Sequence, residues 1–234
     1  MTEAGPDRDW APRFRTVRQG REQLPVIVVD DYAREPERLI EEARSAGLQP
    51  LGANFPGVRA PVAEGLKMAF RQSLETLIQA TFGIDRPLDR LEAYHSLITT
   101  PQADRPLLSR LPHFDGLGAN RIAMVHHLGR SGIGGTAFWR HRSTGFETID
   151  EQRLPAYNAA VNRELMAGAE PLSIYEQVAL WPARFNRLLI YRGDCLHGAD
   201  TPADVLLTAD PATGRFSINV FWWVDPTPPI PADP

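Results

Sequence analysis

The sequence LPHFDG, residues 111–116, places a histidine and an aspartate two positions apart. In an extended strand, residues i and i+2 point to the same side, so the side chains of His113 and Asp115 would converge. Such a pair can be a structural hydrogen bond, a catalytic dyad or part of a metal site. A third ligand elsewhere in the chain would favour the metal.

The strongest candidate for that ligand is His197, which follows the apolar run NRLLIYRG (186–193) in the context GDCLHGAD. Two histidines and one carboxylate form the facial triad of non-haem Fe(II) oxygenases, which leaves coordination positions open. Further along, GRFSINVFWW (214–223) carries Arg215 and Ser217 on one side of a predicted strand. A guanidinium grips a carboxylate with two hydrogen bonds, so the sequence predicts an iron site next to a carboxylate anchor.

The two ends of the chain differ in composition from its middle. Residues 1–22 are polar and rich in arginine, and we expect a flexible segment there. The proline-dense PTPPIPADP at 226–234 predicts an extended tail. Neither an internal repeat nor a long linker divides residues 23–225, so we expect one domain.

Hydrophobic spacing predicts helices early in the chain and short strands after residue 88. The early helices are expected at 35–47 and 64–83, each with a closing glycine, and FPGVRAP at 55–61 predicts a loop. Strands are expected at 25–32, 90–100, 120–129, 134–141, 186–193 and 214–224, and a helical insertion at about 151–171. Helices followed by many short strands predict an α+β, mainly β fold: a β-sandwich or jelly roll flanked by N-terminal helices.

Composition argues against several classes of protein. The formal net charge of −4 gives no basic footprint for nucleic acid, and no run approaches the roughly 18 apolar residues of a membrane span. The N-terminus lacks the apolar core of a secretory signal, and the one cysteine, Cys195, cannot form an internal disulfide. We therefore expect a soluble cytoplasmic protein without nucleic-acid or membrane partners. The sequence leaves a homodimer open.

Taken together, these motifs resemble the Fe(II)/2-oxoglutarate-dependent oxygenase superfamily, and within it the prolyl-hydroxylase-like branch. The family's HxD…H…RxS pattern falls on His113, Asp115, His197, Arg215 and Ser217. The run EAYHSL (92–97) is similar to the strand that carries a tyrosine near 2-oxoglutarate, here Tyr94. IAMVHHLG (122–129) and GGTAF (134–138) are similar to the family's next two strands, so the resemblance covers about residues 90–224.

The resemblance implies a double-stranded β-helix core and a dioxygenase. Such an enzyme couples oxidative decarboxylation of 2-oxoglutarate to hydroxylation of a C–H bond, with O₂ as the oxidant. His113, Asp115 and His197 would bind Fe(II), and Arg215 would hold the distal carboxylate of 2-oxoglutarate, with Ser217 and Tyr94 nearby. Related halogenases replace the carboxylate with a small residue, so the presence of Asp115 favours hydroxylation or another oxidation over halogenation.

The sequence does not name the substrate. The helical insertion at 151–171 favours a lid and hence a small molecule. A protein or peptide side chain, as in prolyl hydroxylases, and a non-catalytic metal- or ligand-binding jelly roll stay open as alternatives.

Further candidate residues lie near the predicted pocket. Adjacent strand residues face opposite sides, so only one of His126 and His127 can line it, and His127 stands where the branch often has tyrosine. Arg140 and Arg142, in the basic stretch WRHRSTG (139–145), are candidates to receive a carboxylate or phosphate of the substrate. A solvated rim is the more common role for such arginines.

Overall fold

Two antiparallel sheets pack against each other in the computed structural model, which describes residues 10–51, 55–202, 205 and 207–224. The strands are β1 (Arg13–Gln19), β2 (Leu24–Asp30), β3 (Gly57–Pro61), β4 (Leu88–Ile98), β5 (Arg121–His127), β6 (Gly135–His141), β7 (Tyr175–Pro182), β8 (Arg187–Arg192), β9 (His197–Asp200) and β10 (Arg215–Val224). The α-helices are α1 (Pro36–Ser45), α2 (Glu64–Phe82), α3 (Leu107–Arg110) and α4 (Leu154–Met166), and short 3₁₀ helices span Gln102–Asp104 and Gly118–Asn120. This mainly β content with flanking helices confirms the predicted class.

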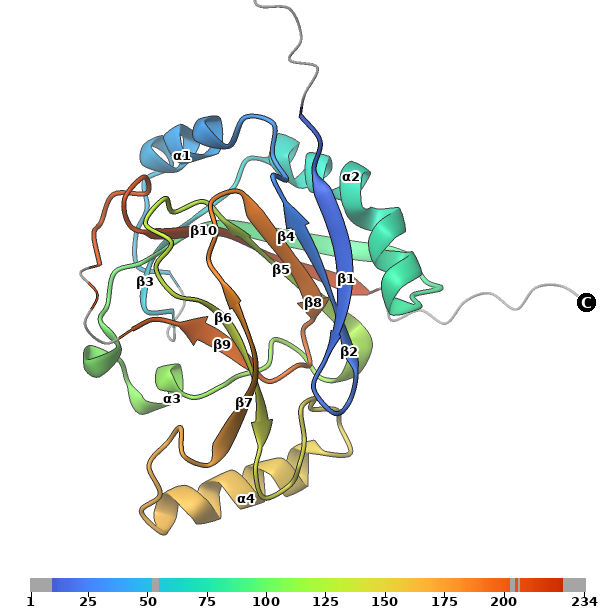
Figure 1. The fold of residues 1–234 in the computed structure, drawn as a ribbon, viewed down its shortest axis with the longest axis vertical. Helices are drawn as coiled ribbons and strands as arrows, with labels where there is room; N and C mark the ends of the chain where they lie inside the picture. Colours follow the sequence, from blue (N-terminus) through green and yellow to red (C-terminus); the bar gives the residue numbers. More distant parts are fainter. Residues whose placement is uncertain (1–9, 52–54, 203–204, 206, 225–234) are drawn as a thin grey trace, which may run out of the picture.

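The larger sheet has the strand order β1-β2-β8-β5-β10-β4-β3, and the smaller one has the order β7-β6-β9. Alternate residues of the larger sheet enter two different cores. On β2, Ile27 and Val29 pack with residues of α1 and α2, whereas Val26 and Val28 pack with Phe138 of β6. Because β2 and β8 are buried on both faces, their sequences are continuous apolar runs. Figure 1 shows α1 and α2 at one end of the molecule and α4 at the opposite end.

The predicted helices are present close to their expected bounds. Helix α2 ends at Gly83, whose φ of +64° is the left-handed conformation that glycine adopts at helix ends, and its N–H donates to the carbonyl of Gln79. Helix α4 lies inside the predicted insertion. Within the described residues, no helix is both long and apolar enough to cross a membrane.

Two predictions about the N-terminal part of the chain were wrong. Residues 13–19, expected in a flexible segment, form β1 and pair with β2 along its whole length. Residues 57–61, expected in a loop, form the edge strand β3 against β4. Most residues of β1 are exposed, so the apolar alternation that marks a half-buried strand is absent. The predicted tail at 226–234 lies outside the described residues.

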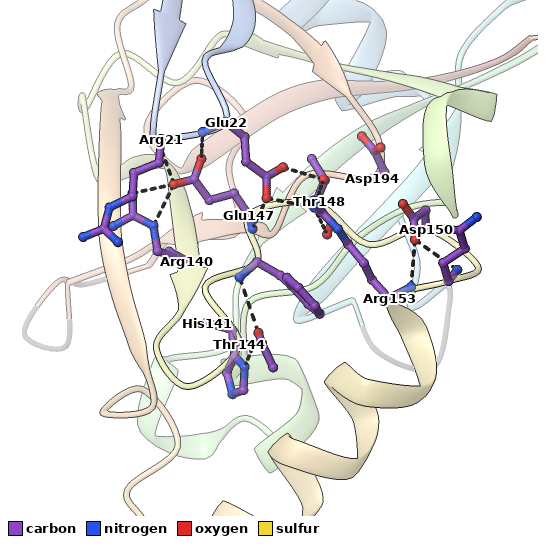
Figure 2. A network of polar contacts seen from close by, with 12 residues as sticks. Arg21, Glu22, Arg140, His141, Thr144, Glu147, Thr148, Asp150, Arg153 and Asp194 are labelled. Atoms are coloured by element: carbon purple, nitrogen blue, oxygen red, sulfur yellow. Dashed lines mark hydrogen bonds and ion pairs between the residues drawn. The ribbon is translucent and has the colours of Figure 1, made fainter.

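A buried carboxylate fixes the turn between β1 and β2. Glu147 is 1% exposed and accepts hydrogen bonds from the backbone N–H groups of Arg21 (2.9 Å) and Glu22 (3.0 Å). Arg140 donates to the same carboxylate from Nε, at 2.8 Å. Glu22 in turn accepts from the Thr148 hydroxyl at 2.6 Å. Figure 2 shows how this network ties the β1–β2 turn to the loop after β6.

We expect Glu147→Gln to lower the free energy of unfolding by about 2–3 kcal/mol, because a neutral amide leaves the buried Arg140 guanidinium without its closest countercharge. Denaturant unfolding would measure the loss. The matched control is Glu176→Gln. Glu176 pairs with the same arginine but has 43% of its side chain exposed, so we expect less than about 1 kcal/mol. Equal losses in the two variants would contradict the role given to Glu147.

Candidate metal centre and pocket

Backbone pairing brings the HxD segment against the start of β9. His113 and His197 exchange two backbone hydrogen bonds of 2.8 Å, and the Asp115 N–H donates to the Gly193 carbonyl at 2.6 Å. The side chains of His113 and Asp115 therefore face the same side as that of His197. Arg121 adds a hydrogen bond to the backbone carbonyl of Asp115, which further fixes the position of the carboxylate.

The three side chains have the separation that a shared metal ion requires. Nε2 of His113 lies 3.8 Å from Oδ1 of Asp115, and Nε2 of His197 lies 3.3 Å from Oδ2. The candidate ligand atoms all lie within 4.8 Å of one another. A metal bound at about 2.0–2.2 Å from nitrogen and oxygen fits between them after small side-chain rotations.

Hydrogen bonding prepares His197 to act as a ligand. Its Nδ1 lies 2.8 Å from the carbonyl oxygen of Cys195, so Nδ1 carries the proton and donates it. Nε2 then keeps its lone pair on the side of Asp115. A second ring nitrogen held in this way is the usual arrangement of a metal-binding histidine.

The pKa values of the three side chains shift in ways that leave His197 more basic than His113. Burial alone would raise the pKa of Asp115, but His197 and His113 hold it below its usual value. Burial alone would lower the pKa of His197, but Asp115 raises it above 6.5. His113 has 56% of its side chain open to the cavity, yet the enclosing walls and His197 lower its pKa to about 4.

These pKa directions predict how metal affinity depends on pH. A metal must displace the proton of His197 at any pH below that group's raised pKa, whereas His113 is already neutral down to about pH 4. Between about pH 5 and 6 we expect the apparent Ni(II) affinity to fall about tenfold per pH unit, the slope for one proton. Calorimetric titrations across this range measure the slope. A slope of zero, or one of two protons, would contradict the assignment.

The three ligands lie on the wall of a cavity of about 590 Å³ that also contains Arg215 and Ser217. Arg215 is 6% exposed; its Nη2 donates to the Gly135 carbonyl at 2.5 Å, and its buried Nε has no partner among the described residues. Burial, with a contribution from Arg105, lowers the pKa of Arg215 to about 10. A buried donor without a partner is costly, and a ligand carboxylate would satisfy it. The Ser217 hydroxyl already pairs with Oδ1 of Asn219 at 2.7 Å.

Two residues that the sequence reasoning missed belong to the same wall. Arg105 is 5% exposed, donates from Nε to the Thr100 carbonyl at 3.0 Å, and leaves its buried Nη2 unpaired among the described residues. Thr201, 3% exposed, likewise leaves its hydroxyl unpaired. Both line the cavity with Arg215. The only sequence signal was an isolated arginine before a proline, which is too common to single out.

A comparison with known protein families identifies the family of this chain. A family model described as "Family of unknown function (DUF6445)" matches residues 10–222. The chain belongs to DUF6445. A comparison of this DUF6445 protein with curated protein sequences gives no match.

Solved structures share the fold of this DUF6445 protein at low sequence identity. HygX from Streptomyces hygroscopicus, crystallised with nickel and 2-oxoglutarate bound, has a TM-score of 0.51 and 12% identity, with 88% of this chain and 87% of HygX covered. SnoN, a non-haem α-ketoglutarate-dependent epimerase from nogalamycin biosynthesis, has a TM-score of 0.50 and 14% identity, with 88% and 79% covered. The fold is therefore that of the Fe(II)/2-oxoglutarate-dependent oxygenases, as the sequence motifs predicted.

The adjacent histidines of β5 face opposite sides of the sheet in the DUF6445 protein. His126 bonds to Asn186 at 2.9 Å and packs against Tyr32, away from the cavity. His127 is paired in register with Ser217, so it faces the inside, where its Nε2 lies 3.5 Å from the hydroxyl of cavity-lining Thr136. Burial holds the pKa of His127 well below its usual value, so it is neutral. His127 itself does not line the cavity, but it contacts Thr136, which does.

Three other predicted positions lie outside the main cavity. The hydroxyl of Tyr94 donates to Glu92 at 3.2 Å, and the ring borders a smaller hollow. Arg140 is held by Glu147 and Glu176 (Figure 2), and Arg142 donates to the Ser173 carbonyl at 3.1 Å. None of the three lines the cavity. We therefore no longer expect the two arginines to receive a substrate anion, or the tyrosine to contact 2-oxoglutarate.

Proposed function

We propose that this DUF6445 protein is an Fe(II)/2-oxoglutarate-dependent dioxygenase that hydroxylates a C–H bond of a small-molecule substrate. One observation carries the proposal. A His-Asp-His group, whose His197 tautomer is fixed, shares a cavity with Arg215, whose buried Nε has no hydrogen-bond partner among the described residues. A metal and a dicarboxylate would satisfy both at once.

The residues of the site fit the Fe(II) ion and the 2-oxoglutarate that this function requires. Neutral imidazoles and a carboxylate suit Fe(II) and leave open positions for a bidentate keto acid and O₂. His113, Asp115 and His197 would hold the metal. The nickel and 2-oxoglutarate present in HygX, which shares this fold, support the same pairing here.

When bound, iron would activate O₂, the oxidant, and 2-oxoglutarate would supply two electrons as it is oxidised to succinate and CO₂. The protein's own residues hold and orient the reactants. Cys195 fixes the His197 ring through its carbonyl, and Arg215 offers a fixed donor fork to the distal carboxylate. The apolar cavity walls Phe114, Trp139 and Leu111 exclude water from the reacting centre.

The strand order supports a double-stranded β-helix core. Strands β4-β10-β5-β8 form one side, and β9-β6-β7 form the other. The HxD segment continues the second side through its bridge from His113 to His197. His113 and His197 therefore lie at the β9 edge of the smaller sheet, and Asp115 lies beside Gly193, just after β8 of the larger sheet.

The size of the cavity supports a small molecule over a protein side chain. A volume of about 590 Å³ lies within the usual range for small-molecule sites, roughly 300–1,000 Å³. We expect the low-molecular-weight fraction of a cell extract to stimulate 2-oxoglutarate turnover and the protein fraction to leave it unchanged. The reverse result would favour a protein or peptide hydroxylase.

The direct test is succinate formation. Purified protein with Fe(II), ascorbate, O₂ and 2-oxoglutarate should form succinate, and protein loaded with Zn(II), which has no redox chemistry, should form none. Asp115→Ala is the matched protein control. Tight metal-dependent 2-oxoglutarate binding without any succinate, even with cell extract, would instead indicate a non-catalytic binding module.

Within the described part of the chain, buried donors of Arg105 and Thr201 have no partner, which supports a wider carboxylate anchor than Arg215 alone. We expect Arg105→Ala to weaken 2-oxoglutarate binding to Ni(II)-loaded protein about tenfold or more, the effect of one hydrogen bond to a charged group. Calorimetry measures it. Arg110→Ala is the control, because Arg110 lines the same cavity but is exposed. Equal, small effects of the two variants would remove Arg105 from the anchor.

A further inference from the structure

A further arginine, besides Arg215, Arg105 and Arg110, lines the cavity. Arg59 lies on the edge strand β3 and lines both the main cavity and the smaller hollow, next to Asp115. Its register partner on β4 is Ser96, and its Nε donates to the Ser96 hydroxyl at 3.2 Å. Ser96 is itself 1% exposed, so this bond fixes the base of the guanidinium.

Aromatic contacts hold the same group in place. The guanidinium carbon of Arg59 lies 3.7 Å from the centroid of the Phe55 ring and 5.7 Å from that of Tyr94. Arginine stacks well on aromatic faces, and stacking leaves the edge N–H groups available. The side chain is therefore oriented before any ligand arrives.

The outer donors of Arg59 are not used within the described part of the chain. Neither Nη atom makes a hydrogen bond or an ion pair there, although Nε does. Burial lowers the pKa of Arg59 to about 10, and the Asp115 carboxylate, with a smaller contribution from Tyr94, opposes this effect. A metal on Asp115 would neutralise that carboxylate and leave the cation without a counterion.

The neighbouring walls define what else a ligand would contact. Apolar and aromatic side chains line the cavity that Arg59 borders, namely Phe55, Leu111, Phe114, Trp139, Leu172 and Phe221, and Phe55 contacts Arg59 directly. Arg215 and Arg105 belong to the anchor for the cosubstrate, so they are not free for the substrate. The two Nη groups of Arg59, unpaired among the described residues, fit the anionic end of a ligand. The apolar walls of the cavity fit an apolar body.

We propose that Arg59 binds a carboxylate of the substrate, and that the substrate class is a small acid with an apolar or aromatic body. This inference rests on the proposed function, because it assigns the substrate side of the same cavity. The two Nη donors pair with the two carboxylate oxygens, while Phe55 and Ser96 keep the fork in position. Arg59 thereby orients the substrate's body toward the metal ligands.

Matched acids and amides test the proposal by binding. The probes are aryl-alkanoates of increasing chain length, from phenylacetate to 4-phenylbutyrate, and their primary amides. They are titrated into Ni(II)- and 2-oxoglutarate-loaded protein by calorimetry. We expect the best acid to bind about tenfold or more tighter than its amide, and Arg59→Gln to abolish this preference. Arg59→Lys should keep part of it, since charge remains but the fork is lost.

Arg110→Gln is the control, since it removes one positive charge from the same cavity at an exposed position; it should keep the preference for acids. Acids that bind no better than amides, a preference that survives in Arg59→Gln, or no binding by either series would each overturn the proposal. A large loss of 2-oxoglutarate affinity in Arg59→Gln would also overturn it, because Arg59 would then belong to the cosubstrate site. Failure of the wild type to take up Ni(II) and 2-oxoglutarate is a separate result, which contradicts the proposed function itself.

Discussion

His197→Ala should lower Ni(II) and Fe(II) affinity by at least about a hundredfold and reduce succinate formation below detection. The partners that merely orient a metal-binding histidine are worth about 10–100-fold in affinity, so loss of the ligand itself should cost at least as much. His197 contributes the ring nitrogen next to Asp115, and the remaining pair, His113 and Asp115, is the weaker two-ligand site. Calorimetric titration of the metal-free variant measures the change.

The fold should survive this substitution, because the backbone bonds between His113 and the residue at 197 do not depend on the side chain. Circular dichroism and thermal unfolding check that point. Asp200→Asn is the matched control, since Asp200 also lines the cavity but lies outside the three-residue ligand group. Wild-type metal affinity in His197→Ala, or an equal loss in Asp200→Asn, would remove His197 from the ligand set.

Arg215→Ala should weaken 2-oxoglutarate binding by at least about a hundredfold while metal affinity stays the same. Removing one partner of a buried charge pair typically costs about 3–5 kcal/mol, and each 1.4 kcal/mol is tenfold in affinity. Arg215 is positioned for such a pair, because it is buried in the cavity with Nε unpaired among the described residues. Titration of 2-oxoglutarate into Ni(II)-loaded protein gives the affinity.

Two variants sharpen this test. Arg215→Lys keeps the charge but not the planar fork, so it should bind with intermediate affinity. Ser217→Ala should change the affinity little, because the Ser217 hydroxyl is already paired with Asn219. If Arg215→Ala binds 2-oxoglutarate as tightly as the wild type, the anchor lies elsewhere in the cavity, and Arg105 becomes the first alternative.

The grouping of the candidate metal ligands could be predicted because their geometry is partly local. His113 and Asp115 are two residues apart in an extended segment, so the strand repeat alone places them on one side. The same repeat put Arg215 and Ser217 together, and it separated His126 from His127. The apolar runs of β2 and β8 and the helical spacing of α1 and α2 were visible for a similar reason, since each pattern repeats within one element.

The partners of the remaining residues depend on contacts between distant segments. Arg140 looked like a free surface cation in the sequence, yet it pairs with a buried glutamate that also binds the β1–β2 turn over a hundred residues away. Tyr94 follows the strand pattern of the family, but its hydroxyl bonds to Glu92 beside it. An isolated charge carries no sequence signal of its partner, because pairing is decided by which segments fold together.

The amino-acid sequence by itself singled out the candidate metal ligands and the candidate carboxylate anchor and determined most of the elements, because each depends on a short repeat along the chain. Only the tertiary structure decided that Arg105 and Thr201 join Arg215 in the cavity wall, and that Arg59 lines the same cavity. These residues come from an irregular segment, a loop and an edge strand with weak patterns of their own. Among the described residues the buried Nη2 of Arg105 and the buried hydroxyl of Thr201 have no partner, and burial removes the water that would otherwise satisfy them.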